Sequence, residues 1–184
     1  MSEDYETATL AGGCFWCIEA AFKELDGVVE ATSGYAGGNV EDPSYEAVCR
    51  GTTGHAEVVQ VVYEPDVLAY EDLLEVFFTI HDPTTKDRQG PDVGSQYRSA
   101  VYYHDEDQRE TVERFVAELD SGSFESYEND EIVTEIEPLE RFWEAEEYHQ
   151  DYYEKNPADR YCQFHAEHKV RKVRERFASA TAEQ

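Results

Sequence analysis

Two cysteines that flank a pair of aromatic residues lie near the start of the chain, in the segment AGGCFWCIEAAF. A thiol attacks as its thiolate, which the unpaired N–H groups and the dipole at a helix N-terminus stabilise. Cys14 follows two glycines and precedes apolar residues at helical spacing, so we expect it at such a terminus. Phe15 and Trp16 add apolar surface beside the sulfur. The segment therefore predicts a nucleophilic thiol next to a hydrophobic slot for a non-reacting part of the substrate.

Three other interpretations of these two thiols are open on the segment alone. A zinc site needs further ligands at the right spacing, but Cys49 and Cys162 are isolated cysteines. The remaining ligand candidates, His165 and His168, lie in a strongly charged helical segment. A dithiol-exchange protein is the second interpretation, because Cys-x-x-Cys at a helix start is the arrangement of thioredoxin-like proteins. The third is purely structural, with two buried cysteines beside core aromatic residues.

Longer segments discriminate between these interpretations. They are GGCFWC, SGYAGG, DPSYEAVCRGTTGHAEVVQVVYEP, HDPTTKDRQGPDVGSQYRSAVYYH and EEYHQDYYEKNP, in that order along the chain. Together they make the chain resemble the peptide methionine sulfoxide reductase A family from Ala8 to about Phe164. The resemblance implies an enzyme that reduces methionine S-sulfoxide, free or in proteins, through thiols and without a metal or organic cofactor.

The resemblance also implies roles for individual residues. Cys14 matches the nucleophile of the family, and Phe15 and Trp16 match the pocket for the methyl group of the substrate. Glu57 matches the acid that protonates the sulfoxide oxygen. A carboxyl group held in an apolar site has a raised pKa and can stay protonated at neutral pH, as this role requires.

Three more residues complete the implied site. Tyr45 and Tyr97 match the two tyrosines whose hydroxyl groups can donate hydrogen bonds to the polarised oxygen. Asp92 matches an aspartate that helps to shape the site. For two other residues we expect structural roles: a hydrogen bond for His55, and burial as a small apolar side chain for Cys49.

The sulfenic acid that forms on the nucleophile must condense with a second thiol before it is oxidised further. Cys162 is the favoured partner, because it follows the break at Asn156-Pro157 in a segment with potential to move. Cys17 is the alternative, and a relay through both is compatible with either. The resemblance includes members with a further cysteine in a glycine-rich tail, which this chain lacks after Cys162. A thioredoxin-like dithiol protein would restore the thiols.

A non-enzymatic function of the same thiols also has to be considered. A redox-sensing or thiol-exchange module would use Cys14 and Cys17 as a switch. It would react with peroxide and would not turn over sulfoxide. The chain offers no dedicated partner surface for such a role, since its only basic cluster, Lys169 to Arg176, is expected to pack on its own acidic domain.

The charge of the chain excludes several partners. With 42 acidic against 15 basic residues, the formal net charge is −27, which repels nucleic acid and anionic membranes. The acidic residues are spread over the sequence, as expected for a folded halophilic protein in a salt-rich cytoplasm. No segment approaches the roughly 18 apolar residues of a membrane span, and the start of the chain lacks the features of a signal peptide. We expect a cytoplasmic monomer.

The elements that must position these residues alternate along the chain. We expect strands at 5–13, 55–65, 96–105 and 131–139, and helices at 14–27, 69–83, 105–122, 140–156 and 167–180. The segment 28–51 is expected to begin as a strand and to continue as a long loop. At 184 residues the chain is predicted to form one catalytic domain, with the segment from about 156 carrying Cys162. The predicted fold is α+β, a ferredoxin-like two-layer sandwich of helices on a mixed or antiparallel sheet.

Overall fold

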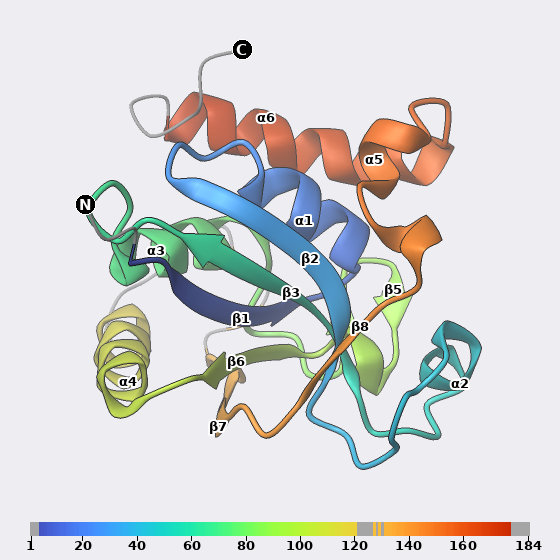
Figure 1. Cartoon of the computed structure of the whole chain (residues 1–184), viewed down its shortest axis with the longest axis horizontal. Coiled ribbons are helices and arrows are strands. Elements are labelled where there is room, and N and C mark those ends of the chain that lie inside the picture. The colour runs from blue at the N-terminus through green and yellow to red at the C-terminus, as the bar shows by residue number, and fades with distance from the viewer. Residues whose placement is uncertain (1–3, 121–126, 128, 130, 178–184) are drawn as a thin grey trace.

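The core of the fold is a β-α-β-β-α-β unit (Figure 1). The structure, a computed structural model, describes residues 4–120, 127, 129 and 131–177. The six elements of the unit are β1 (Glu6–Gly12), α1 (Phe15–Phe22), β2 (Val28–Ala36), β3 (Ala56–Tyr63), α3 (Tyr70–Ile80) and β6 (Ser99–Tyr103).

These four strands lie side by side in the order β6-β1-β3-β2, and every neighbouring pair is antiparallel. Two short strands extend the sheet at its edges. β7 (Glu135–Pro138) pairs parallel to β6, and β8 (Phe142–Glu144) pairs antiparallel to β2. The predicted α+β fold with helices on a mixed sheet is therefore confirmed.

The main hydrophobic core lies between the sheet and helices α1 and α3. Helix α6 (Glu167–Arg176) lies beside α1 on the same side of the sheet (Figure 1). Burying each large apolar side chain contributes about 1.5–3 kcal/mol relative to leaving it exposed. The core is built from aromatic, branched aliphatic and alanine side chains, of which the largest include Phe15, Ile18, Phe22, Leu73, Leu74 and Phe77.

The region expected to be loop contains a short helix, α2 (Tyr45–Cys49). It begins at Ser44, whose hydroxyl accepts a hydrogen bond from the backbone N–H of Ala47 at 3.2 Å. A hairpin of two strands with two residues each, β4 (Arg88–Gln89) and β5 (Asp92–Val93), was also not expected. Both elements are too short to show a hydrophobic period in the sequence.

The helix predicted for 140–156 is wrong. The segment forms strand β8, a 3₁₀ turn at Glu147–His149 and the short helix α5 (Tyr152–Lys155). Pairing with β2 overrides helix propensity here, because the ring of Phe142 packs over Gly34, where a Cβ atom would lie 2.4 Å from it. Asp151 then interrupts the helical conformation, because its φ of +55° is left-handed.

The remaining two predicted helices are present, with their last residues outside the described part of the chain. They are α4 (Glu106–Asp120) and α6, so residues 121–122 and 178–180 of the predicted helices are not described. The basic helix α6 packs on its own domain, as expected. Lys172 donates a hydrogen bond to the carbonyl of Thr79, and Arg174 pairs with Glu24.

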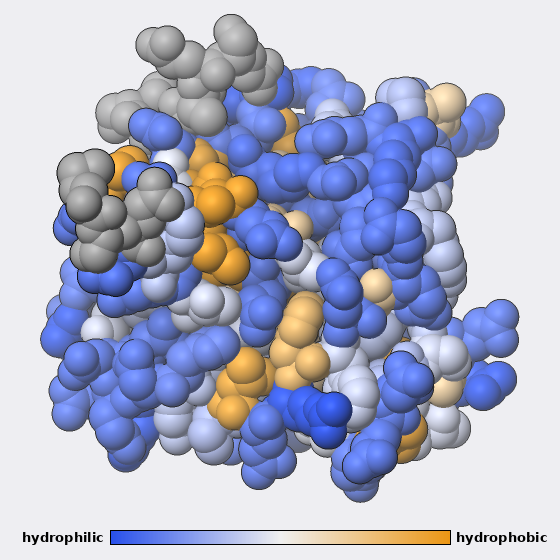
Figure 2. Space-filling view, in the orientation of Figure 1, coloured by the Kyte–Doolittle hydropathy of each residue, from blue (hydrophilic) through white to orange (hydrophobic). Residues whose placement is uncertain are grey.

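The molecular surface is strongly polar. In Figure 2 hydrophilic side chains cover most of the visible face, with a few small apolar patches between them. No helix within the described residues combines the length and apolar character that crossing a membrane requires. Such a surface suits the net charge of −27, since the charged groups remain in contact with solvent and counterions.

Candidate active site

Cys14 lies at the N-cap of α1, as the sequence predicts. Its carbonyl accepts hydrogen bonds from the N–H groups of Cys17 and Ile18, at 3.2 and 3.4 Å. The side chain of Cys14 is half-buried. Helix α1 ends at Phe22, earlier than the predicted end at Gly27. The sulfur therefore lies at the start of a short helix, where the backbone N–H of Trp16 favours its thiolate.

Gly13 allows the chain to turn from β1 into this helix. Its φ is +101°, and a Cβ atom there would lie 2.7 Å from Cγ of Gln89. Gln89 cannot move away freely, because its amide bonds both the N–H and the carbonyl of Asp82. The position of Cys14 therefore depends on the absence of a side chain at residue 13.

We expect Gly13→Ala to lower the free energy of unfolding by more than the about 1–3 kcal/mol that a strained backbone position costs, because the added Cβ also meets Gln89. Thermal unfolding measures the loss, and the alkylation rate of Cys14 should change as the turn shifts. Gly51→Ala is the matched control, because Gly51 also has a positive φ of +73° but has no neighbouring atom within 4 Å of the added Cβ. Equal losses in both variants would mean that the contact with Gln89 has no effect.

The thiols of Cys14 and Cys17 form a hydrogen-bonded pair. Burial raises the pKa of the Cys14 thiol, and the neighbouring Cys17 and Glu57 raise it further. The hydrogen bond from Cys14 lowers the pKa of Cys17 against the effect of burial, and the charge of Lys169 lowers it further. The two thiols titrate as a coupled pair, and the opposite shifts favour the first negative charge on Cys17.

Glu57 projects from β3 into the space beside Cys14. Its carboxyl group is 1% exposed, and Oε1 accepts the backbone N–H of Phe15 at 3.1 Å. Oε2 is buried and has no hydrogen-bond partner. Burial raises the pKa of Glu57 to about 8, so the carboxyl group is mostly protonated at neutral pH. A neutral acid with one free oxygen can donate a proton to a ligand in the pocket.

Tyr45 and Tyr97 border the same space, from α2 and from a 3₁₀ turn at Ser95–Tyr97. Burial raises the pKa of both hydroxyl groups, and the charge of Glu57 raises it further. Both hydroxyl groups therefore stay protonated and can donate hydrogen bonds. Cys49, expected to be buried, is instead exposed and bonds the Tyr45 hydroxyl, because it lies at the end of the surface helix α2. Thus the expectation for Cys49 is wrong.

His55 has the structural role expected of it. Its ring bonds the N–H of Gly38 at 3.0 Å and the carbonyl of Val40 at 2.7 Å. The ring thereby holds the loop after β2 against the start of β3, next to Glu57.

Aromatic rings form the wall of the pocket. Phe15 is fully buried, with its ring centroid 6.2 Å from that of Tyr45. The indole of Trp16 stacks on Tyr152, with centroids 3.8 Å apart and planes 7° apart, and its Nε1–H donates to Nδ1 of His149 at 3.0 Å. The ring of His149 lies 4.3 Å from that of Tyr45. Such a wall suits an apolar group of modest size.

Sequence reasoning did not single out several residues that support this pocket. Glu146 accepts the Tyr35 hydroxyl at 2.8 Å and the backbone N–H of Tyr45 at 3.0 Å, which fixes α2 against the pocket. Tyr161 donates its hydroxyl to the carboxylate of Asp92. The signal available in the sequence was the clustering of aromatic residues in EAEEYHQDYY and DRYC. It did not point to the pocket because the first of these segments was predicted to be part of a helix at 140–156. The supporting residues are His149, Tyr152, Tyr161, Glu146 and Lys169.

Cys162 lies in the same buried cluster as Cys17. It is fully buried at the start of a π-helical turn, Cys162–Ala166, and shares an apolar cluster with Cys17, Ala20 and Val170. Cys17 is also fully buried and packs with Cys14 in this cluster. Cys17 and Cys162 are therefore neighbours in one buried cluster, and Cys14 packs against that cluster.

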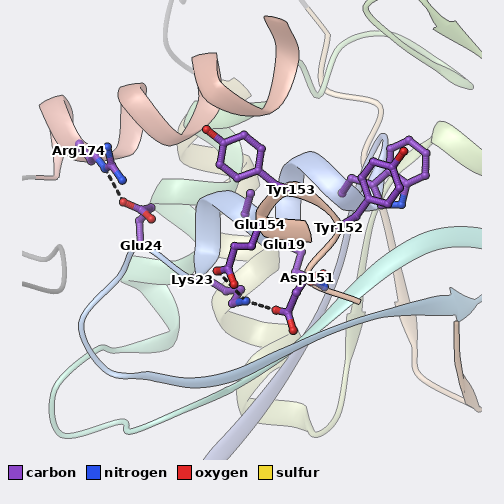
Figure 3. A pocket seen from close by; sticks show the side chains of 10 residues that line it. Glu19, Lys23, Glu24, Asp151, Tyr152, Tyr153, Glu154 and Arg174 are labelled. Atoms are coloured by element: carbon purple, nitrogen blue, oxygen red, sulfur yellow. Dashed lines mark hydrogen bonds and ion pairs between the residues drawn. The ribbon is translucent and has the colours of Figure 1, made fainter. Parts of the chain in front are cut away.

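A second contact fixes the segment that carries Cys162 to α1. Both oxygens of the buried Glu19 accept the backbone N–H of Asp151, at 2.9 and 3.0 Å, and the Asp151 carboxylate pairs with Lys23. Figure 3 shows these side chains around a cavity beside α1, with Tyr152 and Tyr153 on its other side. The position of the C-terminal segment is therefore determined by α1 itself.

Within the described residues, no group of three or more His, Cys, Asp or Glu side chains is arranged to hold a metal ion. The functional groups present are paired thiols at a helix start, a neutral buried acid and two tyrosine hydroxyl groups. Fold and site together define a thiol-dependent oxidoreductase of the α+β class.

Comparisons with known proteins identify the family. The model of the family "Peptide methionine sulfoxide reductase" matches residues 6–181, and the chain belongs to this family. Peptide methionine sulfoxide reductase MsrA of Natronomonas pharaonis is 66% identical over 173 residues, 94% of this chain and 95% of that protein. The reduced form of Mxr1 from Saccharomyces cerevisiae superposes with a TM-score of 0.79 at 39% identity, covering 88% of this chain and 91% of that one. The protein is thus a methionine sulfoxide reductase that uses thiols, and relatives of 60–66% identity come from halophilic archaea.

Proposed function

We propose that the protein reduces the S epimer of methionine sulfoxide, in peptides, proteins or as the free amino acid, with Cys14 as nucleophile and Glu57 as acid. The observation that carries this proposal is the free, buried Oε2 of a carboxyl group with a raised pKa, next to a thiol at a helix start. A sulfoxide needs both a nucleophile at sulfur and a proton at oxygen. The pocket offers one of each.

In the proposed reaction the Cys14 thiolate attacks the sulfur of the sulfoxide, and Glu57 gives its proton to the oxygen. The hydroxyl group then moves from the substrate sulfur to the Cys14 sulfur, and both the sulfur–oxygen bond of the substrate and the transient bond between the two sulfurs break. The products are methionine and a sulfenic acid on Cys14, so the substrate sulfur is reduced and the cysteine is oxidised by two electrons. The Tyr45 and Tyr97 hydroxyl groups stabilise the oxygen while negative charge develops on it.

Apolar contacts orient the substrate in this proposal. Phe15 and Trp16 contact the methyl group, which places the sulfoxide sulfur next to Cys14. Asp92 shapes the entrance, since its carboxylate holds the Tyr161 hydroxyl over the same cavity. A methyl group is the only part of the substrate that a small aromatic pocket must recognise.

We further propose that Cys17 resolves the sulfenic acid and that Cys162 then takes over the disulfide. The hydrogen bond between Cys14 and Cys17 supports the first step, and the shared burial of Cys17 and Cys162 supports the second. In the first step the sulfur–oxygen bond of the sulfenic acid breaks and water leaves. In the second, the Cys162 thiol displaces Cys14 from Cys17, and Cys14 is again a free thiol. The sequence favoured Cys162 as the first partner; this geometry favours the relay.

A thioredoxin-like dithiol protein is the proposed electron donor. One solved relative is Mxr1 from Saccharomyces cerevisiae in complex with Trx2, with a TM-score of 0.51 and 30% identity over 83% of this chain and 89% of that one. We also propose that residues 1–184 act as one catalytic domain, as a monomer in the cytoplasm, without nucleic acid or membrane partners. The charge of −27 supports the last point.

A peptide that contains both epimers of methionine sulfoxide tests the activity. The reduced protein is incubated with the peptide and excess dithiothreitol at low and at molar salt, and each epimer is followed by chromatography. Only the S epimer should disappear, and the matched variant Cys14→Ser should leave both epimers unchanged. Cys49→Ser is the control for loss of a thiol outside the relay, and it should retain activity.

Turnover of the R epimer, or activity in Cys14→Ser, would contradict the proposal. If folded protein reduces neither epimer at any salt concentration but still forms a disulfide with peroxide, the thiol-switch function replaces it. A requirement for molar salt would follow from the self-repulsion of the acidic surface.

A further inference from the structure

Lys169 belongs to α6, but its side chain reaches the C-terminal end of a different helix, α3. Its ammonium group donates a hydrogen bond to the carbonyl of Ile80, the last residue of α3. Lys172, one turn further along α6, bonds the carbonyl of Thr79 at 3.1 Å in the same way. Both lysines therefore satisfy carbonyl groups at the negative end of the α3 dipole. If capping α3 were their only role, substitution of Lys169 and of Lys172 should have the same effect.

Only Lys169 of these two also borders the cavity at the thiols. The residues that line this cavity include Cys14, Cys17, Asp92, Tyr161 and Lys169. Val170, the next residue of α6, packs in the same buried cluster as Cys17. The packing of Val170 holds this turn of α6 against α1, and the hydrogen bond to Ile80 holds the Lys169 ammonium group in place.

Among the described residues, the other titratable groups that act on Cys17 are acids. They are Cys14 on α1, Glu57 on β3, Asp92 on β5, Tyr161 before the π-helical turn and Cys162 within it. His165 also lines the cavity. Hydrogen bonds from Cys14 and Tyr161 favour a thiolate on Cys17, whereas burial and the charge of Asp92 oppose it. The net charge of −27 opposes it as well, and the charge of Lys169 offsets these effects.

We propose that Lys169 is a positioning residue whose ammonium group stabilises the Cys17 thiolate for attack on the oxidised Cys14. The inference rests on the proposed role of Cys17 in the relay. In that step the Cys17 sulfur forms a bond to the Cys14 sulfur, and the sulfur–oxygen bond of the sulfenic acid breaks. The oxygen leaves as hydroxide, which takes a proton from solvent and becomes water. Lys169 keeps its proton throughout.

The ionisation behaviour of both groups agrees with this assignment. The hydrogen bond from Cys14 and the charge of Lys169 lower the pKa of Cys17 in spite of its burial. Burial lowers the pKa of Lys169, whereas Cys17 raises it. Since this pair is shielded from solvent, salt should screen it much less than it screens surface charges.

The test measures the ionisation of Cys17 directly. In a Cys14→Ser/Cys49→Ser/Cys162→Ser protein, Cys17 is the only thiol, and its ultraviolet thiolate absorbance is titrated against pH at low and at molar salt. Lys169→Gln in this protein should raise the midpoint by about one to two pH units, so that the thiolate fraction at neutral pH falls at least about tenfold. Lys169→Arg should restore most of the shift. Lys172→Gln, which removes the same kind of α3 cap, should leave the midpoint unchanged.

An unchanged midpoint in folded Lys169→Gln, or an equal shift in Lys172→Gln, would overturn the inference. If the Lys169 variants do not fold, the interaction is measured instead through the pKa of Lys169, in protein that keeps this residue. Charge coupling is reciprocal, so Cys17→Ser should lower the pKa of Lys169, seen as faster amine labelling below that pKa. No change in labelling would also overturn it. Because these proteins are not assayed for turnover, the result is independent of whether sulfoxide is reduced.

Discussion

Glu57→Gln is expected to slow the chemical step by about 10²–10⁴-fold, the usual contribution of a positioned general acid. The amide keeps the shape of the carboxyl group and has no proton of suitable acidity to give to the sulfoxide oxygen. The rate is the methionine released in a single turnover, measured by rapid quench without added reductant. Glu19→Gln is the matched control, because Glu19 is equally buried but bonds Asp151 and Ser33 away from the pocket. A loss of similar size in both variants would remove Glu57 from the reaction.

The pH dependence should identify the same group. The proton donor is present below the pKa of Glu57, about 8, and is lost as the pH rises through that value. The single-turnover rate, divided by the fraction of Cys14 that is thiolate at each pH, should therefore decline above about pH 8 in the native enzyme. Glu57→Gln should lack this decline. An alkaline decline that persists in the variant would mean that another group supplies the proton.

The same residue should cost stability. Burial raises the folded-state pKa of Glu57 from 4.5 to about 8, so the folded protein holds a proton in this pH range that the unfolded chain has lost. The free energy of unfolding therefore falls as the pH rises from 4.5 to 8 and is constant in this respect above 8. Glu57→Gln removes the effect and should be a few kcal/mol more stable than the native protein at pH 9, with little difference at pH 4. Thermal unfolding at both pH values measures this.

Cys17→Ser should lower steady-state turnover with a thioredoxin-like reductant by about 10³-fold or more. An intramolecular thiol acts at an effective concentration far above that of any external thiol, and the variant loses it. The first turnover should remain, because Cys14 and Glu57 are unchanged. The sulfenic acid should then accumulate and react with dimedone, which mass spectrometry detects on Cys14.

Cys162→Ser separates the two steps of the relay. It should form the disulfide between Cys14 and Cys17 at the native rate, without a sulfenic acid that dimedone can trap. Slower reduction by the thioredoxin-like protein should be its only defect. If the sulfenic acid accumulates in Cys162→Ser and not in Cys17→Ser, Cys162 is the first partner and the proposed order is reversed.

The parts of the fold that could be predicted are those with a long hydrophobic period. Helix α1 was recognised from its apolar spacing and the preceding glycines, and α3 and β3 from similarly clear patterns. The segment 140–156 was misread because its glutamate, alanine and tyrosine content favours a helix, whereas the pairing of Phe142 over Gly34 is visible only in three dimensions.

The site was predictable where a motif carried it. The positions of Cys14, Glu57 and Tyr45 around one pocket follow from segments that resemble the family. The support from His149 and the approach of Lys169 to the thiols could not be predicted, because neither is close to Cys14 in sequence. Such contacts depend on how α6 and the segment before it return to α1.

The composition of the core has a consequence for the lifetime of the enzyme. Methionine, whose oxidation inserts a polar oxygen into packed interiors, occurs in this chain only as Met1. The described core between the sheet and α1 is filled by phenylalanine, leucine, isoleucine, valine, tyrosine and alanine. No residue after Met1 can therefore form the lesion that this enzyme repairs, and the described core needs no such repair. Under oxidant exposure that disrupts methionine-containing proteins, its packing should be preserved and its catalytic thiols should be the first groups to react.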